Sequence, residues 1–152
     1  MNLSVQFKHG LQQFCIANLE RKSELLKNQI LARKQDLESA SKSSAGDKHE
    51  TSRAMIHLEQ EKLGIQFQQI YKQQLVLSQI VVKQHLSIQS GTLIKTNKAL
   101  FYIAIALGKL KFKEQDVFVI SPVAPLAQAF LNSKFSKEVC FNNVTHTVLA
   151  II

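Results

Sequence analysis

Residues 56–81 read IHLEQEKLGIQFQQIYKQQLVLSQIV and carry the most regular pattern in the chain. Two rows of positions interleave here in alternating steps of four and three residues. One row contains Ile56, Leu63, Ile70 and Leu77, and the other contains Gln60, Phe67, Gln74, Val81 and Ile88. This alternation is typical of the contact seam of a coiled coil. It predicts a helix of roughly 35 residues, which reaches about 50 Å at about 1.5 Å per residue.

A partner for this helix lies upstream, where the same spacing occurs less regularly. The positions concerned are Leu19, Leu26, Ile30, Arg33 and Leu37, after an earlier set of Phe7, Leu11 and Phe14. Residues 39–46 are rich in serine and end in Gly46, which is typical of a helix stop followed by a turn. Two long helices joined by a short turn run antiparallel. We therefore predict an antiparallel coiled-coil arm over residues 1–88, with its tip near residues 41–50.

The composition changes near residues 87–91, after which β-branched residues, aromatic residues and both prolines occur. The segments predicted to be strands are residues 92–96, 101–107, 116–120, 138–141 and 145–151. Asn142-Asn143 suits a tight hairpin turn, and residues 126–131 have the pattern of one short helix. These features predict a small sheet packed on one helix over residues 89–152, and the fold class is therefore α+β.

The composition limits the classes to which the protein can belong. A hydrophobic fraction of 45% in 152 residues is enough for a core. Cys15 and Cys140 are far apart and form no CxxC pattern, which excludes a disulfide scaffold and a cysteine zinc site and favours reduced thiols. The longest apolar run, residues 99–107, is shorter than the roughly 20 residues of a membrane-spanning helix. Since the first residues lack a signal-peptide pattern, we expect a cytoplasmic protein that binds no membrane. We also expect a monomer.

Common catalytic motifs are missing from the sequence. It has no glycine-rich phosphate loop, no HExxH and no GxSxG. The five histidines, at positions 9, 49, 57, 85 and 146, form no i,i+4 pair, so we expect surface or partly buried residues rather than ligands. The net charge of +8 permits nucleic acid or an acidic protein as a partner, but the lysines are scattered and select neither.

The predicted tip combines charge with a defined spacing in Gly46-Asp47-Lys48-His49-Glu50. One interpretation is structural, because a capping aspartate with a glutamate three residues later is close to a capping box. The other interpretation is chemical. Residues at i and i+3 share a face of a helix, so Asp47 and Glu50 could complete a Mg²⁺ site whose other oxygen ligands come from another protein or a phosphate. The residues alone leave both interpretations open.

The tip motif and a second motif together resemble the bacterial Gre transcript-cleavage factors. That family has Gly-Asp, two residues and Glu at the tip of its coiled coil, and Ser-Pro followed by a small Ala/Leu helix in its C-terminal domain. Residues 46–50 and 121–131 are similar to these two motifs and occur in the same order. The resemblance implies a divergent member of the Gre family, with an FKBP-like domain over residues 89–152.

The resemblance also implies a function and a partner. The coiled coil of a Gre factor enters the secondary channel of RNA polymerase, where two acidic tip residues stabilise a second Mg²⁺ and the polymerase cleaves backtracked RNA. By resemblance, Asp47 and Glu50 take this catalytic, metal-holding role in trans. The protein itself is then not an enzyme, and the isolated chain holds no Mg²⁺. The resemblance further implies contact with the RNA 3′ segment inside the complex, and with DNA only indirectly.

Three other hypotheses stay open. Lys48 and residues 51–54 differ from the residues usual in the family, so the second hypothesis is a polymerase-binding protein that inhibits or modulates transcription. The third is a helical-hairpin adaptor in which the tip acids only cap a helix. The fourth is prolyl isomerase activity, which would need an aromatic pocket. We expect the aromatic residues of this half to form its core instead: Phe101, Tyr102, Phe112, Phe118, Phe130, Phe135 and Phe141.

Overall fold

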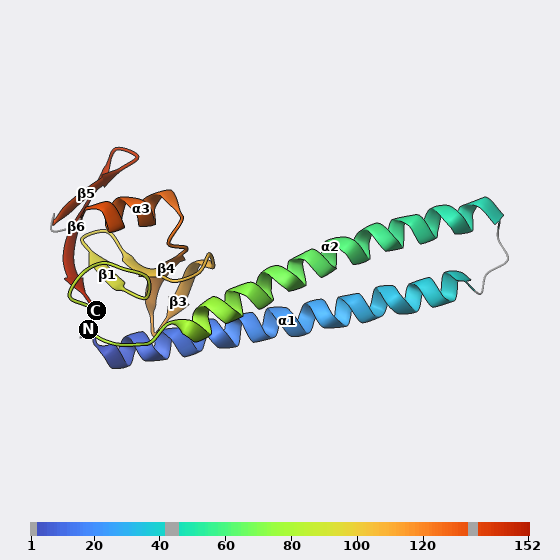
Figure 1. The fold of residues 1–152 in the computed structure, drawn as a ribbon, viewed down its shortest axis with the longest axis horizontal. Helices are drawn as coiled ribbons and strands as arrows, with labels where there is room; N and C mark the ends of the chain where they lie inside the picture. The colour runs from blue at the N-terminus through green and yellow to red at the C-terminus, as the bar shows by residue number, and fades with distance from the viewer. Residues whose placement is uncertain (1–2, 42–45, 134–136) are drawn as a thin grey trace. The chain divides into compact units, whose positions relative to one another are not determined.

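The structure, a computed structural model, describes residues 3–41, 46–133 and 137–152, and the side chains of residues 41 and 46–49 lie outside this description. Two long helices come first, α1 (Val5–Ser41) and α2 (Gly46–Gln79) (Figure 1). The elements after them are β1 (Leu93–Thr96), β2 (Leu100–Ile103), β3 (Gly108–Phe112), β4 (Gln115–Ile120), α3 (Pro125–Asn132), β5 (Glu138–Phe141) and β6 (Val144–Ile151). This order confirms an α+β protein with a helical hairpin region, a six-stranded mixed sheet and one short helix.

The chain divides into two compact units. Ala17–Gln74 forms one, called here the helical unit, and Met1–Ile16 together with Leu75–Ile152 forms the other, called the sheet unit. Over the described residues, no helix of either unit combines the length and apolar character that a membrane crossing requires.

The helical unit is an antiparallel pair of helices whose burial follows the predicted seam (Figure 1). On α2 the buried or half-buried positions include Ile56, Gln60, Leu63, Phe67, Ile70 and Gln74. On α1 they include Leu19, Leu26, Ile30, Arg33 and Leu37. An ion pair links the two helices, with Arg33 Nη1 at 3.2 Å from Glu59 Oε1. The predicted coiled-coil spacing is therefore confirmed in this unit.

Two leucines of α2 provide a matched test of the seam. Leu63 is 8% exposed, whereas Leu58, away from the seam, is 63% exposed. We expect Leu63→Ala to lower the free energy of unfolding by about 2–3 kcal/mol, because it leaves a cavity at the helix contact. Leu58→Ala should change it by about 0.5 kcal/mol or less. Urea titration followed by far-UV circular dichroism measures both, and equal losses would contradict the seam.

The sheet unit contains one sheet with the strand order β3-β4-β2-β1-β6-β5. Strands β2 and β4 are parallel, with Phe101 opposite Phe118. The remaining neighbours pair antiparallel. Asn142 and Asn143 join β5 to β6 with φ values of 50° and 62°. A two-residue hairpin turn with both φ angles positive favours asparagine, so the predicted turn is confirmed.

Helix α3 supplies one side of the core in the sheet unit. Pro125 occupies one of its first positions, where the missing N–H costs no helical hydrogen bond. Two residues of α3 are fully buried, Ala127 and Phe130. The buried core residues that pack together from the strands and this helix are Ile94, Phe101, Ile103, Ala127, Phe130 and Val139. The sheet therefore has a continuous apolar contact with its one helix.

Helix α2 stops before Val81 and Ile88, so the predicted continuation of its seam to these residues is wrong. The reason is a contact from the first turns of α1. The side-chain amide of Gln12 donates to the carbonyl oxygen of Leu77 at 3.0 Å and to that of Ile80 at 2.8 Å. The last carbonyls of a helix need such partners when no further turn follows. Gln12 therefore caps α2 where the spacing alone predicts more helix.

The sequence does not predict strand β3, and the strand predicted over residues 101–107 is too long, because β2 ends at Ile103. Lys113 and Glu114 join β3 to β4 with φ values of 47° and 61°. Lysine and glutamate are unusual in this left-handed region, so the turn carries no recognisable signal. The other four predicted strands and the helix over residues 126–131 are confirmed within one residue of their observed ends.

Candidate functional site

The predicted tip residues belong to the first turns of α2. Asp47 is the second residue of the helix, and its side chain lies outside the described residues, as do residues 42–45 of the predicted tip. Glu50 follows three positions later and is exposed. Their i,i+3 spacing in a helix puts both positions on one face, and the positive end of the helix dipole favours carboxylates there. The metal-holding role of this pair stays a prediction.

A search of the described side chains for metal ligands gives no second candidate. Among them, no three His, Cys, Asp or Glu residues lie close enough together to hold a metal ion. The two cysteines are free: Cys15 is buried and Cys140 is exposed. Burial raises the pKa of Cys15 to about 12, so its thiol is protonated at neutral pH. Cys15 is therefore a structural residue and no nucleophile.

The aromatic residues of the sheet unit form its core, as predicted. Phe101, Tyr102 and Phe130 are buried. Phe112, half-buried, packs against Phe7 of α1 with ring centroids 5.2 Å apart. Two further members of the predicted set are half-buried, Phe118 and Phe141, and Phe135 lies outside the described residues. Phe101, Tyr102 and Phe130 are thus core residues rather than the lining of an open pocket.

His146 lies within this aromatic core. Its ring centroid is 5.4 Å from that of Phe101 and 5.8 Å from that of Phe130. Burial lowers the pKa of His146, and Lys98 adds to the effect. The unfolded chain takes up a proton near pH 6.5 before the folded protein does, so this contribution to stability is lost as the pH falls below that value. His146 is therefore a neutral core residue at neutral pH.

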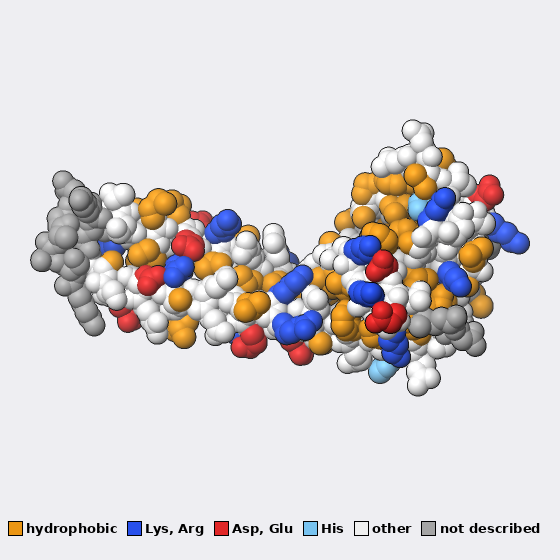
Figure 2. Space-filling model, turned by 180° about the vertical axis from the view of Figure 1, so that it is seen from behind, with side chains coloured by type: hydrophobic (Ala, Val, Ile, Leu, Met, Phe, Trp, Pro, Cys, Tyr) orange, Lys and Arg blue, Asp and Glu red, His pale blue; other side chains and the backbone are white. Residues whose placement is uncertain are grey.

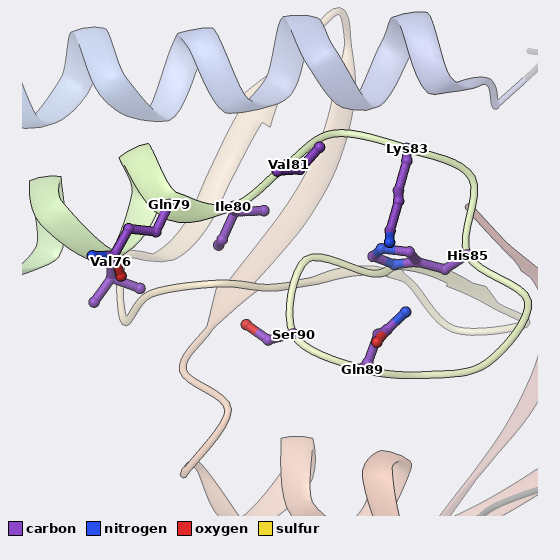
Figure 3. Close-up of a pocket in the computed structure, with 8 residues that line it drawn as sticks. All are labelled: Val76, Gln79, Ile80, Val81, Lys83, His85, Gln89 and Ser90. Atoms are coloured by element: carbon purple, nitrogen blue, oxygen red, sulfur yellow. The ribbon is translucent and has the colours of Figure 1, made fainter.

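The segment after α2 forms a pocket of about 340 Å³ in the sheet unit, called here the Lys83 pocket (Figure 3). Its polar lining residues are Gln79, Lys83, His85, Gln89 and Ser90. Three apolar residues, Val76, Ile80 and Val81, complete the wall. In Figure 3, Lys83 and His85 come from one side of the loop, and Gln89 and Ser90 from its other arm. Sequence reasoning missed this pocket because it predicts helix through most of the segment.

A buried lysine lies close to this pocket. Lys8 is 0% exposed, and its ammonium donates to the carbonyl oxygen of Ile152 at 2.7 Å. Burial lowers the pKa of Lys8 to about 8, and the charge of Lys83 adds to the effect. Burial lowers the pKa of His85 too, with further lowering by Lys8 and Lys83. Lys8 and Lys83 therefore repel each other here, and their charges favour the neutral form of His85.

The lowered pKa of Lys8 predicts a pH effect on stability. Between pH 8 and 10.5 the unfolded chain binds more protons at this residue than the folded protein does, so the free energy of unfolding should rise with pH across this range. In Lys8→Met this rise should be smaller by about 1–2 kcal/mol, while the carbonyl of Ile152 keeps its bond from the Leu93 amide. Urea titrations at pH 7.5 and 10 measure the free energy of unfolding, and the exposed Lys95→Met is the control. If this free energy rose equally with pH in wild type and Lys8→Met, the lowered pKa would not belong to Lys8.

Comparison with known proteins finds no matching family model, no matching curated protein and no matching solved structure. The function therefore has to be argued from the residues and the architecture.

Proposed function

We propose that this protein is a Gre-like transcription elongation factor of the bacterial cytoplasm. In this proposal the hairpin of α1 and α2 enters the secondary channel of RNA polymerase. Asp47 and Glu50 then help to hold a second Mg²⁺ at the active site of the polymerase, which cleaves backtracked RNA. The protein supplies ligands and has no active site of its own. Its contacts with the RNA 3′ segment are made within that complex.

The observation that carries the proposal is the position of the two acids. They occupy the first turns of α2, directly after the connection between two antiparallel helices. The 34 residues of α2 correspond to about 50 Å at about 1.5 Å per residue. A helix pair of this length can carry two carboxylates far into a narrow channel. Two protein carboxylates do not complete a Mg²⁺ site, which fits a shared metal better than a metal bound by this chain alone.

The architecture of the sheet unit supports the same proposal. A mixed sheet with one short helix follows the hairpin, and Ser121-Pro122 precedes that helix. We propose that this unit is FKBP-like and holds the protein at the outer face of the polymerase. The core positions of Phe101 and Phe130 support a role in binding over prolyl isomerase activity.

The second candidate function is inhibition without cleavage. It is favoured by Lys48, which brings a positive charge between the two acids, and by the sequence Thr51-Ser52-Arg53-Ala54 after them. A cation beside a metal site opposes metal binding through like-charge repulsion. This candidate keeps the polymerase as the partner and differs only in what the tip does there.

Transcript cleavage in a stalled, backtracked elongation complex tests the proposal. Cognate polymerase, Mg²⁺ and labelled RNA are incubated with the wild-type protein, and polymerase binding is measured in parallel. Mg²⁺-dependent shortening of the RNA from its 3′ end is the expected result. Binding without cleavage would replace the proposal with the inhibitor. The absence of binding would overturn both and leave the helical-hairpin adaptor.

A further inference from the structure

The Lys83 pocket is lined by hydrogen-bond donors and by no carboxylate. Lys83 brings an ammonium group, Gln79 and Gln89 bring amide N–H groups, and Ser90 brings a hydroxyl group. All four side chains are exposed, so their donors are available to a ligand. A group of donors without acidic acceptors is complementary to an anion.

Thr92 Oγ1 joins three residues of the loop that carries these donors. It lies 2.7 Å from His85 Nδ1 and accepts a bond from the backbone N–H of Gln89 at 3.0 Å. Its hydroxyl group donates to the carbonyl of Ser87 at 3.4 Å. These contacts hold the loop closed.

Among the described residues, no Asp or Glu forms an ion pair with the lysines around the pocket, Lys8 and Lys83. The exposed basic residues of β3 differ, because Lys109 lies 3.0 Å from Asp116 and Lys111 lies 3.4 Å from Glu114. Figure 2 shows such basic and acidic side chains next to one another on the surface of the sheet unit.

A second cavity of about 460 Å³ in the same unit shows what distinguishes the Lys83 pocket. It is lined by three lysines, Lys95, Lys98 and Lys109, but also by Asp116, which pairs with Lys109. A carboxylate in the wall opposes an anion, so this cavity is a poorer site for one. The Lys83 pocket differs from this cavity in that no carboxylate lines it.

The loop that carries the donors is held in place. The Gly91 amide donates to the carbonyl of Ile103 at 2.6 Å, and the Thr92 amide donates to the carbonyl of Gln89 at 3.0 Å. Gly91 has a φ of +89°, and a Cβ at this position would lie 2.9 Å from Ile80 Cγ2. The close approach of the loop to the pocket wall therefore requires glycine here. The backbone that carries Gln89 and Ser90 is therefore ordered before a ligand binds, which lowers the cost of ordering it on binding.

We propose that the Lys83 pocket binds a small oxyanion, a phosphate or carboxylate group, through Lys83, Gln79, Gln89 and Ser90. The apolar wall of Val76, Ile80 and Val81 would cover the organic part of a molecule that carries this group. The volume of about 340 Å³ is in the range of small-molecule sites. This binding does not depend on the function proposed above, because all lining residues belong to the sheet unit.

An NMR titration of the full chain with inorganic phosphate tests the proposal, with acetate as a second ligand at constant ionic strength. We expect saturable amide shifts confined to residues 79–92. Lys83→Gln should weaken the binding about tenfold or more, and Gln89→Glu should abolish it by adding a negative charge. Both side chains are exposed, so neither variant disturbs the core. The ligand that binds more tightly identifies the source of the oxyanion.

The matched control is Lys98→Gln, which removes a lysine from the other cavity. The affinity of Lys98→Gln for the oxyanion should stay within about twofold of the wild-type affinity, since a general charge effect at exposed sites is small. Equal losses of oxyanion affinity in Lys83→Gln and Lys98→Gln would mean that the anion is attracted by the overall positive charge rather than by the pocket. That result would overturn the proposal. The absence of saturable shifts with both ligands would overturn it as well.

Discussion

If the proposed function holds, Asp47→Ala/Glu50→Ala is expected to reduce the stimulated cleavage of backtracked RNA at least about tenfold, because the second Mg²⁺ would lose two oxygen ligands. The seam of the hairpin does not include these positions, so the substitutions should leave the hairpin folded. Affinity for RNA polymerase should therefore stay unchanged. Cleavage is measured on labelled RNA over a range of Mg²⁺ concentrations. A variant that binds the metal more weakly should regain part of the rate when Mg²⁺ is raised.

Two further variants separate metal binding from helix capping. Asp47→Asn/Glu50→Gln keeps the size of both side chains and leaves them oxygen acceptors for the first N–H groups of α2, but the negative charges are gone. This variant should fail in cleavage as the alanine variant does. Glu61→Ala removes an exposed carboxylate farther along α2 and should cleave like wild type. Normal cleavage by the Asn/Gln variant would show that the acids act only as caps.

The parts of the fold that follow from local spacing are predictable from the sequence. The seven-residue spacing of Ile56, Leu63 and Ile70 requires only that a helix buries one stripe, and these positions are buried or half-buried. Asn142-Asn143 is recognisable because asparagine tolerates a positive φ. In both cases the residues that decide the structure are close together in the sequence.

The parts that fail depend on distant contacts or on unusual turn residues. Helix α2 ends where Gln12, 65 positions before Leu77, donates its amide to the last carbonyls. No periodicity within α2 contains that information. Strand β3 is missed because Lys113 and Glu114 adopt a turn conformation that their side chains do not favour. Tertiary context overrides local preference at both places.

The two candidate sites also differ in whether nearby or distant residues in the sequence form them. Asp47 and Glu50 are visible in the sequence because a helix brings i and i+3 together. The Lys83 pocket is not visible, since Lys83 and His85 lie in a segment where the seam spacing predicts helix. Their grouping with Gln89 depends on the bond between His85 and Thr92, which holds the loop closed. To predict such a site from the sequence, one would first have to predict that α2 ends before Lys83.

Phe101→Ala is expected to lower the free energy of unfolding of the sheet unit by about 3–5 kcal/mol. Phe101 is 4% exposed, and its ring centroid lies 5.3 Å from that of Phe130 and 5.4 Å from that of His146. Alanine would leave a cavity where strand β2 meets α3 and would also remove these aromatic contacts. Native proteins have free energies of unfolding of about 5–15 kcal/mol, so this substitution would remove a large part of the stability.

Urea unfolding followed by tyrosine fluorescence measures this loss, because the chain has two tyrosines and no tryptophan. A Tyr71→Phe background leaves Tyr102, which is buried in the sheet unit, as the single probe. Phe101→Leu keeps most of the volume and should cost less than about 1.5 kcal/mol. Val123→Ala, at a position that is 82% exposed, should cost about 0.5 kcal/mol or less. If Phe101→Ala were no more costly than Val123→Ala, the aromatic residues would not be the core of the unit, and an aromatic binding pocket would have to be considered again.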